Sequence, residues 1–385
     1  MSYTAHRLEF VDRQIADDLE RITARAVDLM PAHIHSVLLT GSFGRAEGSV
    51  LIEGGKVRVI NDYDLMVVLG EPDKFRYAVL CRKYRPRLAT LARELSAELG
   101  VAQIDIATVH LSYFNGCQPA RIANYEVKNG HRLLYGAEDP CAWMPDYRAE
   151  DISLFEGTWL FRNRGGGMLL AGRSLLGNDR LPAGEEERVI IECNQAIRAM
   201  GDSILLMKGK YHFSYAKRME IIQGLDLHDI APAEVIVPLY VQALEQKLRP
   251  DFSVYRNMDF RKWWFDVKRL FGEFFLYFEE RRLGLRIRDW ADYAGIAKAE
   301  DRLEFRSLLA HLAGKGTLSI RGGVLKARRG RLIALMALLL FAVREDRILE
   351  ALLGRAAFMF GRRPSGDPLK DWLCLTEAFL RLWHP

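Results

Sequence analysis

The stretch NDYDLMVVL, residues 61–69, decides the fold of the first third of this 385-residue chain. Its run of apolar residues is typical of a buried strand, and apolar side chains on both faces favour a central one. Asp62 and Asp64 are two residues apart, so on this strand both side chains are predicted to project from the same face. Two such carboxylates repel each other unless a cation lies between them or one takes up a proton. The pattern therefore predicts a cation site where this strand begins.

A glycine-containing turn precedes this strand. The stretch LLTGSFGRAEGSV, residues 38–50, places an apolar, strand-like run directly before Gly41 and Ser42. The segment 49–60 then has two β-branched runs around a Glu-Gly-Gly-Lys centre, which predicts a hairpin. Nineteen residues separate Ser42 from Asp62. A hairpin would absorb that excess and let the two motifs meet, whereas a rigid strand within the sheet would keep them apart.

A third carboxylate lies further along the chain, in QIDIATV, residues 103–109. On a strand, Ile104 and Ile106 must point to the face opposite Asp105. A charge between two isoleucines needs a partner, because burying it alone is costly. D-x-D alone is a weak signal, shared by glycosyltransferases, calcium loops and solvated strand ends. Three carboxylates on neighbouring strands, however, are hard oxygen ligands suited to two Mg²⁺ or Mn²⁺ ions that also bind phosphates.

Together these motifs resemble the nucleotidyltransferase superfamily typified by DNA polymerase β. The matching segments are Gly41-Ser42 in LLTGSFGRAEG, Asp62-Tyr63-Asp64 in NDYDLMVVL and Asp105 in QIDIATV. The form GSFGRAEG is similar to bacterial members in which Arg and Glu follow the Gly-Ser motif. The resemblance covers about residues 30–140, and the spacing between Gly-Ser and D-x-D is longer here than is typical of the family.

The resemblance implies metal-dependent transfer of a nucleoside monophosphate from an NTP to an acceptor hydroxyl or phosphate, with release of pyrophosphate. Asp62 and Asp64 would bind both metals, Mg²⁺ or Mn²⁺. Asp105 would complete the metal site beside the acceptor oxygen and take up its proton. Gly41-Ser42 would hold the β- and γ-phosphates, and Arg45 would neutralise charge on the leaving pyrophosphate.

The rest of the chain has helical periodicity, and the predicted helices span 151–163, 184–208, 213–224, 231–248 and 258–283. The predicted fold class is α+β: a small mixed β-sheet nucleotidyltransferase domain flanked by helices, then a mostly α-helical C-terminal part. The predicted domains are 1–145 (catalytic), 146–285 (helical, completing the nucleotide cleft) and 286–385 (C-terminal helical). Residues 316–330 are interpreted as a small hairpin or a basic loop, and the tryptophans at 263 and 264 as core residues.

Basic and aromatic residues cluster in LMKGKYHFSYAKR, residues 206–218. Amines, hydroxyls and aromatic rings in one turn could bind phosphates and stack a base, with Lys208 and Lys217 as the predicted nucleotide-binding residues. The alternative is a basic interhelical loop with its aromatic rings packed inward. The segment 162–167, RNRGGG, is a second basic, glycine-rich candidate, and the alternative is that its glycines break the helix and simply make a turn.

Several other classes of site are disfavoured. The five cysteines are scattered, with no C-x-x-C pair and no histidine at metal-ligand spacing, so they are interpreted as idle thiols in a reducing compartment. His110 and His131 are interpreted as hydrogen-bonded structural residues. The N-terminus has no apolar signal segment, and the most apolar run, 332–343, is too short to span a bilayer. A cytoplasmic protein without membrane contact is predicted.

The net charge of +5 is unevenly distributed. Residues 1–150 hold 18 Lys and Arg against 20 Asp and Glu, which leaves 37 against 30, or +7, for residues 151–385. A basic half is compatible with polyanionic ligands and also with an ordinary solvated surface. Two alternatives therefore stay open: a nucleotide-binding regulatory protein on this fold without turnover, and an RNA- or DNA-tailing enzyme. The acceptor could be an antibiotic, a protein side chain, tRNA, a second nucleotide or a sugar.

Overall fold

The computed structural model describes residues 2–71, 73–116, 118–178, 180–300 and 329–383. The chain groups into two compact units, Met1–Glu156 with Ile204–Asp251, and Gly157–Ser203 with Phe252–Pro385. The fold is α+β, a small mixed sheet with a helical C-terminal part, as predicted. The predicted domains 1–145, 146–285 and 286–385 are contiguous segments, unlike these units, and stay a prediction.

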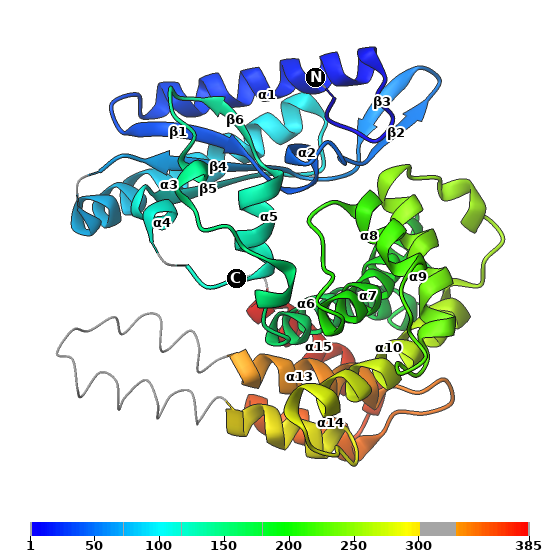
Figure 1. Ribbon diagram of the computed structural model, residues 1–385. Coiled ribbons are helices and arrows are strands. Elements are labelled where there is room, and N and C mark those ends of the chain that lie inside the picture. Colours follow the sequence, from blue (N-terminus) through cyan, green and yellow to red (C-terminus); the bar gives the residue numbers. More distant parts are fainter. Residues whose placement is uncertain (1, 72, 117, 179, 301–328, 384–385) are drawn as a thin grey trace. The chain divides into compact units, whose positions relative to one another are not determined.

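The first unit is built on a four-stranded sheet in the order β5-β4-β1-β6 (Figure 1). The strands are β1 (Ile34–Leu39), β4 (Tyr63–Leu69), β5 (Ile104–His110) and β6 (Arg132–Tyr135). β1 pairs antiparallel with both β4 and β6, whereas β4 and β5 are parallel. The predicted hairpin is confirmed: β2 (Val50–Glu53) and β3 (Lys56–Val59) form a separate antiparallel pair outside this sheet.

The described helices of the first unit are α1 (Glu9–Leu29), α2 (Gly41–Gly44), α3 (Lys74–Leu99), α4 (Ser112–Asn115), α5 (Ile122–Gly130), α8 (Tyr215–Gln223) and α9 (Ala233–Leu248), with the 3₁₀ turns η1 (Pro140–Trp143) and η2 (Ala149–Asp151). The ends of α3 follow from its sequence. Asp73 accepts hydrogen bonds from the backbone N–H groups of Phe75 and Arg76, and Gly100 adopts the left-handed conformation that ends the helix. The helix continues through Pro86.

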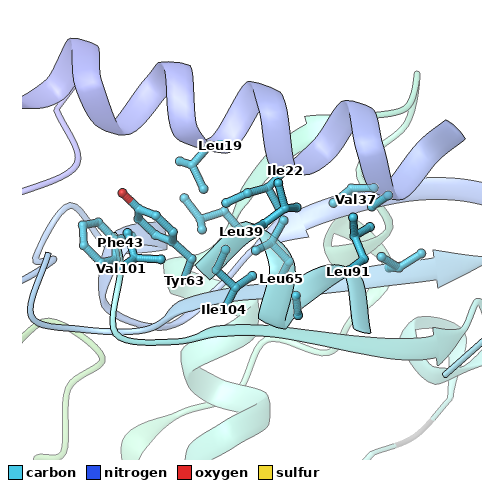
Figure 2. Close-up of a cluster of buried hydrophobic side chains, with 14 of the residues drawn as sticks. Leu19, Ile22, Val37, Leu39, Phe43, Tyr63, Leu65, Leu91, Val101 and Ile104 are labelled. Carbon is cyan, nitrogen blue, oxygen red and sulfur yellow. The ribbon is translucent and has the colours of Figure 1, made fainter. Parts of the chain in front are cut away.

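A hydrophobic core lies on each face of this sheet. The first contains the apolar stripe of α1 and side chains of α3, β1, β4 and β5, as Figure 2 shows for Leu19, Leu39 and Leu65 among others. The α1 stripe recurs every three or four residues, the spacing that lines one face of a helix. The second core, on the opposite face, is formed by Leu38, Val68, Phe114, Cys141 and Met144. Residues that alternate along a strand therefore belong to different cores.

The structure also describes α6 (Phe155–Leu176), α7 (Glu185–Met207), α10 (Phe260–Leu283), α13 (Arg329–Ala342), α14 (Glu350–Phe360) and α15 (Pro368–Trp383), with the 3₁₀ turn η3 (Phe252–Tyr255), and residues 290–300 are helical as well. The predicted core role of the tryptophan pair is confirmed for Trp264, which is fully buried and whose indole N–H donates to the Met168 carbonyl at 2.9 Å. The hairpin or loop predicted at 316–330 lies outside the described residues, apart from its last two.

The glycine run at 165–167 does not break the helix, and the predicted turn there is wrong, because all three residues lie within α6. A Cβ atom at Gly165 would overlap the Met336 side chain, one at Gly166 the Trp383 ring and one at Gly167 the Glu192 carboxylate. The three glycines thus let neighbouring side chains lie directly against the helix backbone, and this close packing outweighs their low helix propensity.

Candidate functional site

Strand alternation places Asp64 and Asp105 on one face of the sheet. Tyr63 is fully buried in the core beneath α1, where its hydroxyl donates to Asp18 at 2.8 Å, so the next residue, Asp64, points to the opposite face. On β5, Ile104 and Ile106 pack into the same core, and Asp105 between them faces away. Asp64 and Asp105 are register partners in the parallel pair β4–β5. The two carboxylates are therefore cross-strand neighbours.

β4 begins at Tyr63, one residue later than the sequence predicted, so Asp62 lies just before the strand rather than on it. Its half-buried carboxylate accepts no hydrogen bond in the part of the chain that the structure describes. Burial raises the pKa of Asp62, the charge of Asp105 raises it further, and Lys247 acts in the opposite direction. Asp62 is thus electrostatically coupled to the aspartate on the neighbouring strand.

Asp64 has a strongly raised pKa. Burial, followed by the charges of Asp62 and Asp105, raises the pKa of its carboxyl to about 6, against the opposing effects of Lys247 and Arg45. Within the described ranges no donor hydrogen-bonds to this carboxylate. Desolvation and like-charge repulsion therefore act on it without a compensating hydrogen bond, and a divalent cation is the ligand that would relieve both.

The chemistry of this donor set fits Mg²⁺ or Mn²⁺. Asp105 is exposed, and its Oδ1 accepts a hydrogen bond from the Gln103 amide at 2.7 Å, so one side of the group is open to water and phosphate. The nearest oxygens of the three carboxylates do not all lie within 4.8 Å of one another. Among the described residues, only the ligand atoms of His131, Asp139 and Cys141 form a group that close. Binding one ion through all three aspartates would require them to move closer.

Gly41 brings the Gly-Ser motif against Asp64. The residue opens α2 directly after β1, with φ at +61°, and a Cβ atom there would overlap the Asp64 carboxylate. The backbone N–H of Thr40 donates to the Asp64 carbonyl at 2.8 Å, and Ser42 is buried. Only glycine meets both the backbone angle and the close approach. The two motifs therefore meet, because the β2–β3 hairpin accommodates the long segment between them.

Arg45 is held by carboxylates inside the first unit. Its side chain is 4% exposed, its Nη1 lies 2.9 Å from Glu126, its Nε lies 3.8 Å from Glu47, and its guanidinium lies 4.9 Å from the centre of the Tyr215 ring. The guanidinium still lowers the pKa of Asp64. Its predicted contact with pyrophosphate stays a prediction, and its observed partners are these two acids.

Lys208 and Lys217, the other predicted nucleotide-binding residues, pair with local acids. The Lys208 ammonium lies 2.6 Å from Asp229, and the exposed Lys217 ammonium lies 2.5 Å from Glu220 on the same helix. Neither is among the charges that shift the pKa of Asp62 or Asp64. The loop between them packs an aromatic ring inward, since Tyr211 is buried, which agrees with the structural alternative for this segment.

Lys247 is the basic residue that the sequence did not single out. It lies on α9, is 9% exposed, and its ammonium donates a hydrogen bond to the side-chain oxygen of Asn61, beside the first aspartate of D-x-D. Its charge lowers the pKa of both Asp62 and Asp64. In the sequence it is one charge on an amphipathic helix, 186 residues from Asn61, and no local pattern distinguishes it.

Glu126 connects this region to the segment 204–251. It accepts hydrogen bonds from Arg45, from the buried Arg218 and, at 2.7 Å, from the Tyr211 hydroxyl. Burial acts to raise its pKa, but the two guanidinium groups outweigh burial and the pKa of Glu126 is lowered. One partly buried carboxylate, shared by two buried arginines, thus links these segments within the first unit.

Glu47 makes a second tie at the start of α8. Its carboxylate accepts hydrogen bonds from the Ser214 hydroxyl at 2.7 Å and from the backbone N–H groups of Tyr215 and Ala216 at 2.9 and 3.0 Å. The two backbone N–H groups are among the donors that a helix leaves unpaired at its N-terminus. The Arg-Ala-Glu of GSFGRAEG therefore anchors α8 and its preceding loop to the sheet.

No helix among the described residues is long and apolar enough to cross a membrane. The sequence matches no protein-family model and no curated protein.

Proposed function

We propose that this chain is a metal-dependent nucleotidyltransferase that moves a nucleoside monophosphate from an NTP to an acceptor. The observation that carries the proposal is the juxtaposition of four residues at one end of β4. Asp64 and Asp105 are register partners, Asp62 is coupled to both, and Gly41 lies against Asp64. Three acids and a Gly-Ser turn at one place are the components that nucleotidyl transfer requires.

In this mechanism Asp62, Asp64 and Asp105 would hold Mg²⁺ or Mn²⁺, which would neutralise phosphate charge and lower the pKa of the acceptor oxygen. Asp105, the exposed acid, accepts the proton that the acceptor hydroxyl loses. A bond forms between the acceptor oxygen and the α-phosphorus, and the bond from that phosphorus to the bridging oxygen of the β-phosphate breaks. Gly41-Ser42 binds the leaving pyrophosphate through backbone N–H and hydroxyl groups.

Lys247 supplies a positive charge on the side of the site formed by α9. Its ammonium is positioned by Asn61, and it favours the ionised forms of Asp62 and Asp64. Ionised carboxylates are the forms that bind a metal ion, so Lys247 keeps the acids ready for it at neutral pH. This role is independent of the predicted phosphate contacts of Lys208 and Lys217.

The test is a screen of labelled NTPs with Mg²⁺ or Mn²⁺ against acceptor classes, read by pyrophosphate release and by the mass shift of the acceptor. Asp105→Asn should abolish turnover and leave the fold intact, as judged by circular dichroism. A matched control is Asp146→Asn, whose side chain is 99% exposed, and it should retain full activity.

The outcomes separate the alternatives. NTP binding without pyrophosphate release across all acceptor classes would favour a regulatory protein. Steep salt dependence of RNA or DNA binding, together with lengthening of the strand, would favour a tailing enzyme. Normal turnover by Asp105→Asn would refute the proposed site.

A further inference from the structure

A second group of ligand-type side chains lies outside the aspartate site. His131 directly follows α5, Asp139 precedes η1 and Cys141 lies within η1. One ligand atom from each residue lies within 4.8 Å of the other two. Spacing along the chain did not reveal the group, because the residues are eight and two positions apart and come together through the turn between β6 and η1.

The hydrogen bonds of His131 leave a position for a cation. Its Nδ1 lies 2.7 Å from the carbonyl oxygen of Val127, which can only accept, so Nδ1 carries a hydrogen. In a neutral imidazole, Nε2 then presents a lone pair, and it faces the Asp139 carboxylate at 2.8 Å. Two acceptors at this distance share a proton, and a zinc ion in its place, with bonds of about 2.0–2.1 Å to each atom, would move them slightly apart. A backbone carbonyl that fixes Nδ1–H is also the outer contact that orients metal-binding histidines.

Cys141 adds a soft donor to this pair. The residue is 1% exposed, and its backbone N–H donates to Asp139 Oδ1 at 3.0 Å, which holds the carboxylate beside it. The Lys128 ammonium donates to the carbonyls of Cys141 and Met144 at 3.1 and 2.9 Å and so fixes the turn. The buried sulfur therefore lies beside a carboxylate and an imidazole, with one ligand atom of each residue within 4.8 Å of the other two.

We propose that His131, Asp139 and Cys141 form a zinc site separate from the aspartate site. Imidazole nitrogen, carboxylate oxygen and thiolate sulfur are a mixed set that suits Zn²⁺ and not Mg²⁺. The ligands are His131 Nε2, one Asp139 oxygen and Cys141 Sγ, with water as the fourth. Starting from the imidazolium and the thiol, binding releases two protons, one from Nε2 and one from Sγ, and the Zn²⁺ charge balances the thiolate and the carboxylate.

The site would stabilise the end of α5. His131 follows that helix directly, and Glu126, which holds Arg45 and Arg218, lies on it. Asp139 has a side chain that is 39% exposed, so zinc can enter from its side while the sulfur stays buried. The ion pair of His131 and Asp139 already links the helix end to the turn. Bound zinc would strengthen that link.

Cobalt substitution tests the proposal on the full-length chain. After removal of metal by a chelator, one equivalent of Co²⁺ should produce a sulfur-to-cobalt charge-transfer band, and one equivalent of Zn²⁺ should abolish it. The aspartate site has no sulfur and cannot give this band, so the test is independent of the proposed transferase activity. Cys141→Ser should lose the band, whereas the control Cys193→Ser, another buried thiol, should retain it.

A second measurement uses the other ligands. Asp139→Asn should weaken Zn²⁺ binding by about 10-fold or more, as loss of carboxylates around zinc does elsewhere. Zinc should raise the thermal midpoint of the wild-type chain and of Cys193→Ser but not that of Cys141→Ser. A wild-type chain without a cobalt–sulfur band, or a band that persists in Cys141→Ser, would overturn the zinc site and leave a histidine–aspartate ion pair in its place.

Discussion

Asp64→Asn is expected to stabilise the protein while abolishing its proposed activity. The amide has the shape of the carboxyl group but no charge, so it resembles the protonated form that burial and the neighbouring acids favour. Folding raises the pKa of Asp64 from 3.8 to about 6. At about 1.36 kcal/mol per pKa unit, ionising Asp64 in the folded state costs about 3 kcal/mol at neutral pH. The variant should gain up to that amount in free energy of unfolding.

The sign of the pH dependence follows from the direction of the shift. Because the pKa of Asp64 is higher in the folded state, the folded wild-type protein binds more protons than the unfolded chain between pH 3.8 and about 6. The corresponding stability is fully present below 3.8 and is lost as the pH rises through about 6. The gain of Asp64→Asn over wild type should therefore be largest above pH 6 and should vanish toward pH 4.

Urea denaturation in the presence of EDTA, followed by circular dichroism at pH 7.5 and at pH 4, measures this difference. The matched control Asp146→Asn, a fully solvated carboxylate of the same unit, should show no comparable gain at either pH. Adding Mg²⁺ at pH 7.5 should stabilise wild type and leave Asp64→Asn unchanged, because only the ionised site binds the metal. An Asp64→Asn protein no more stable than wild type at pH 7.5, or equally stabilised at pH 4, would refute the reasoning.

Three further substitutions test separate parts of the site. Gly41→Ala should cost at least about 1–2 kcal/mol of stability, because alanine is strained at φ +61° and its Cβ would overlap the Asp64 carboxylate. Thermal denaturation measures this loss, and an unchanged midpoint would contradict the prediction. Lys247→Met should lower kcat/KM for the NTP about 10-fold or more through loss of a charged contact. Lys217→Met should change kcat/KM little, and equal effects of the two substitutions would argue against the proposed role of Lys247. Glu126→Gln should cost up to about 3–5 kcal/mol in urea denaturation, because it removes the charge that the buried guanidinium groups of Arg45 and Arg218 share. The exposed Glu220→Gln serves as the control, and similar losses in both variants would contradict the role of this network.

The elements around the aspartate site could be predicted because their signals are local. Alternation and β-branched runs predicted β4, β5 and the β2–β3 hairpin, and all three are present. The prediction failed at Gly165–Gly167, where helix propensity favoured a turn. Close contacts with distant side chains decided that α6 continues through the glycines, and local sequence contains no information about such contacts.

The electrostatic partners of the site could not be predicted in this way. A charged residue on an amphipathic helix looks the same in the sequence whether it faces water, a neighbour on the same helix or a buried acid. Lys217 proved to pair with Glu220 on its own helix, whereas Lys247 proved to lie beside D-x-D. Interaction energy falls with distance in space and with exposure to water, and neither quantity follows from separation along the chain.

The proposed zinc ligands are likewise brought together by the fold and not by a local sequence pattern. The sequence correctly treats His131 as hydrogen-bonded, but it gave no reason to group it with Cys141. The sequence by itself determined the strands, the hairpin and the three aspartates, because side-chain alternation and turn chemistry act over a few residues. Only the tertiary structure decided that Gly41 lies against Asp64, that Arg45 is held by Glu126 and that Lys247 lies beside D-x-D. Those contacts depend on how α5 and α9 pack around the sheet, and packing joins residues that the chain keeps far apart.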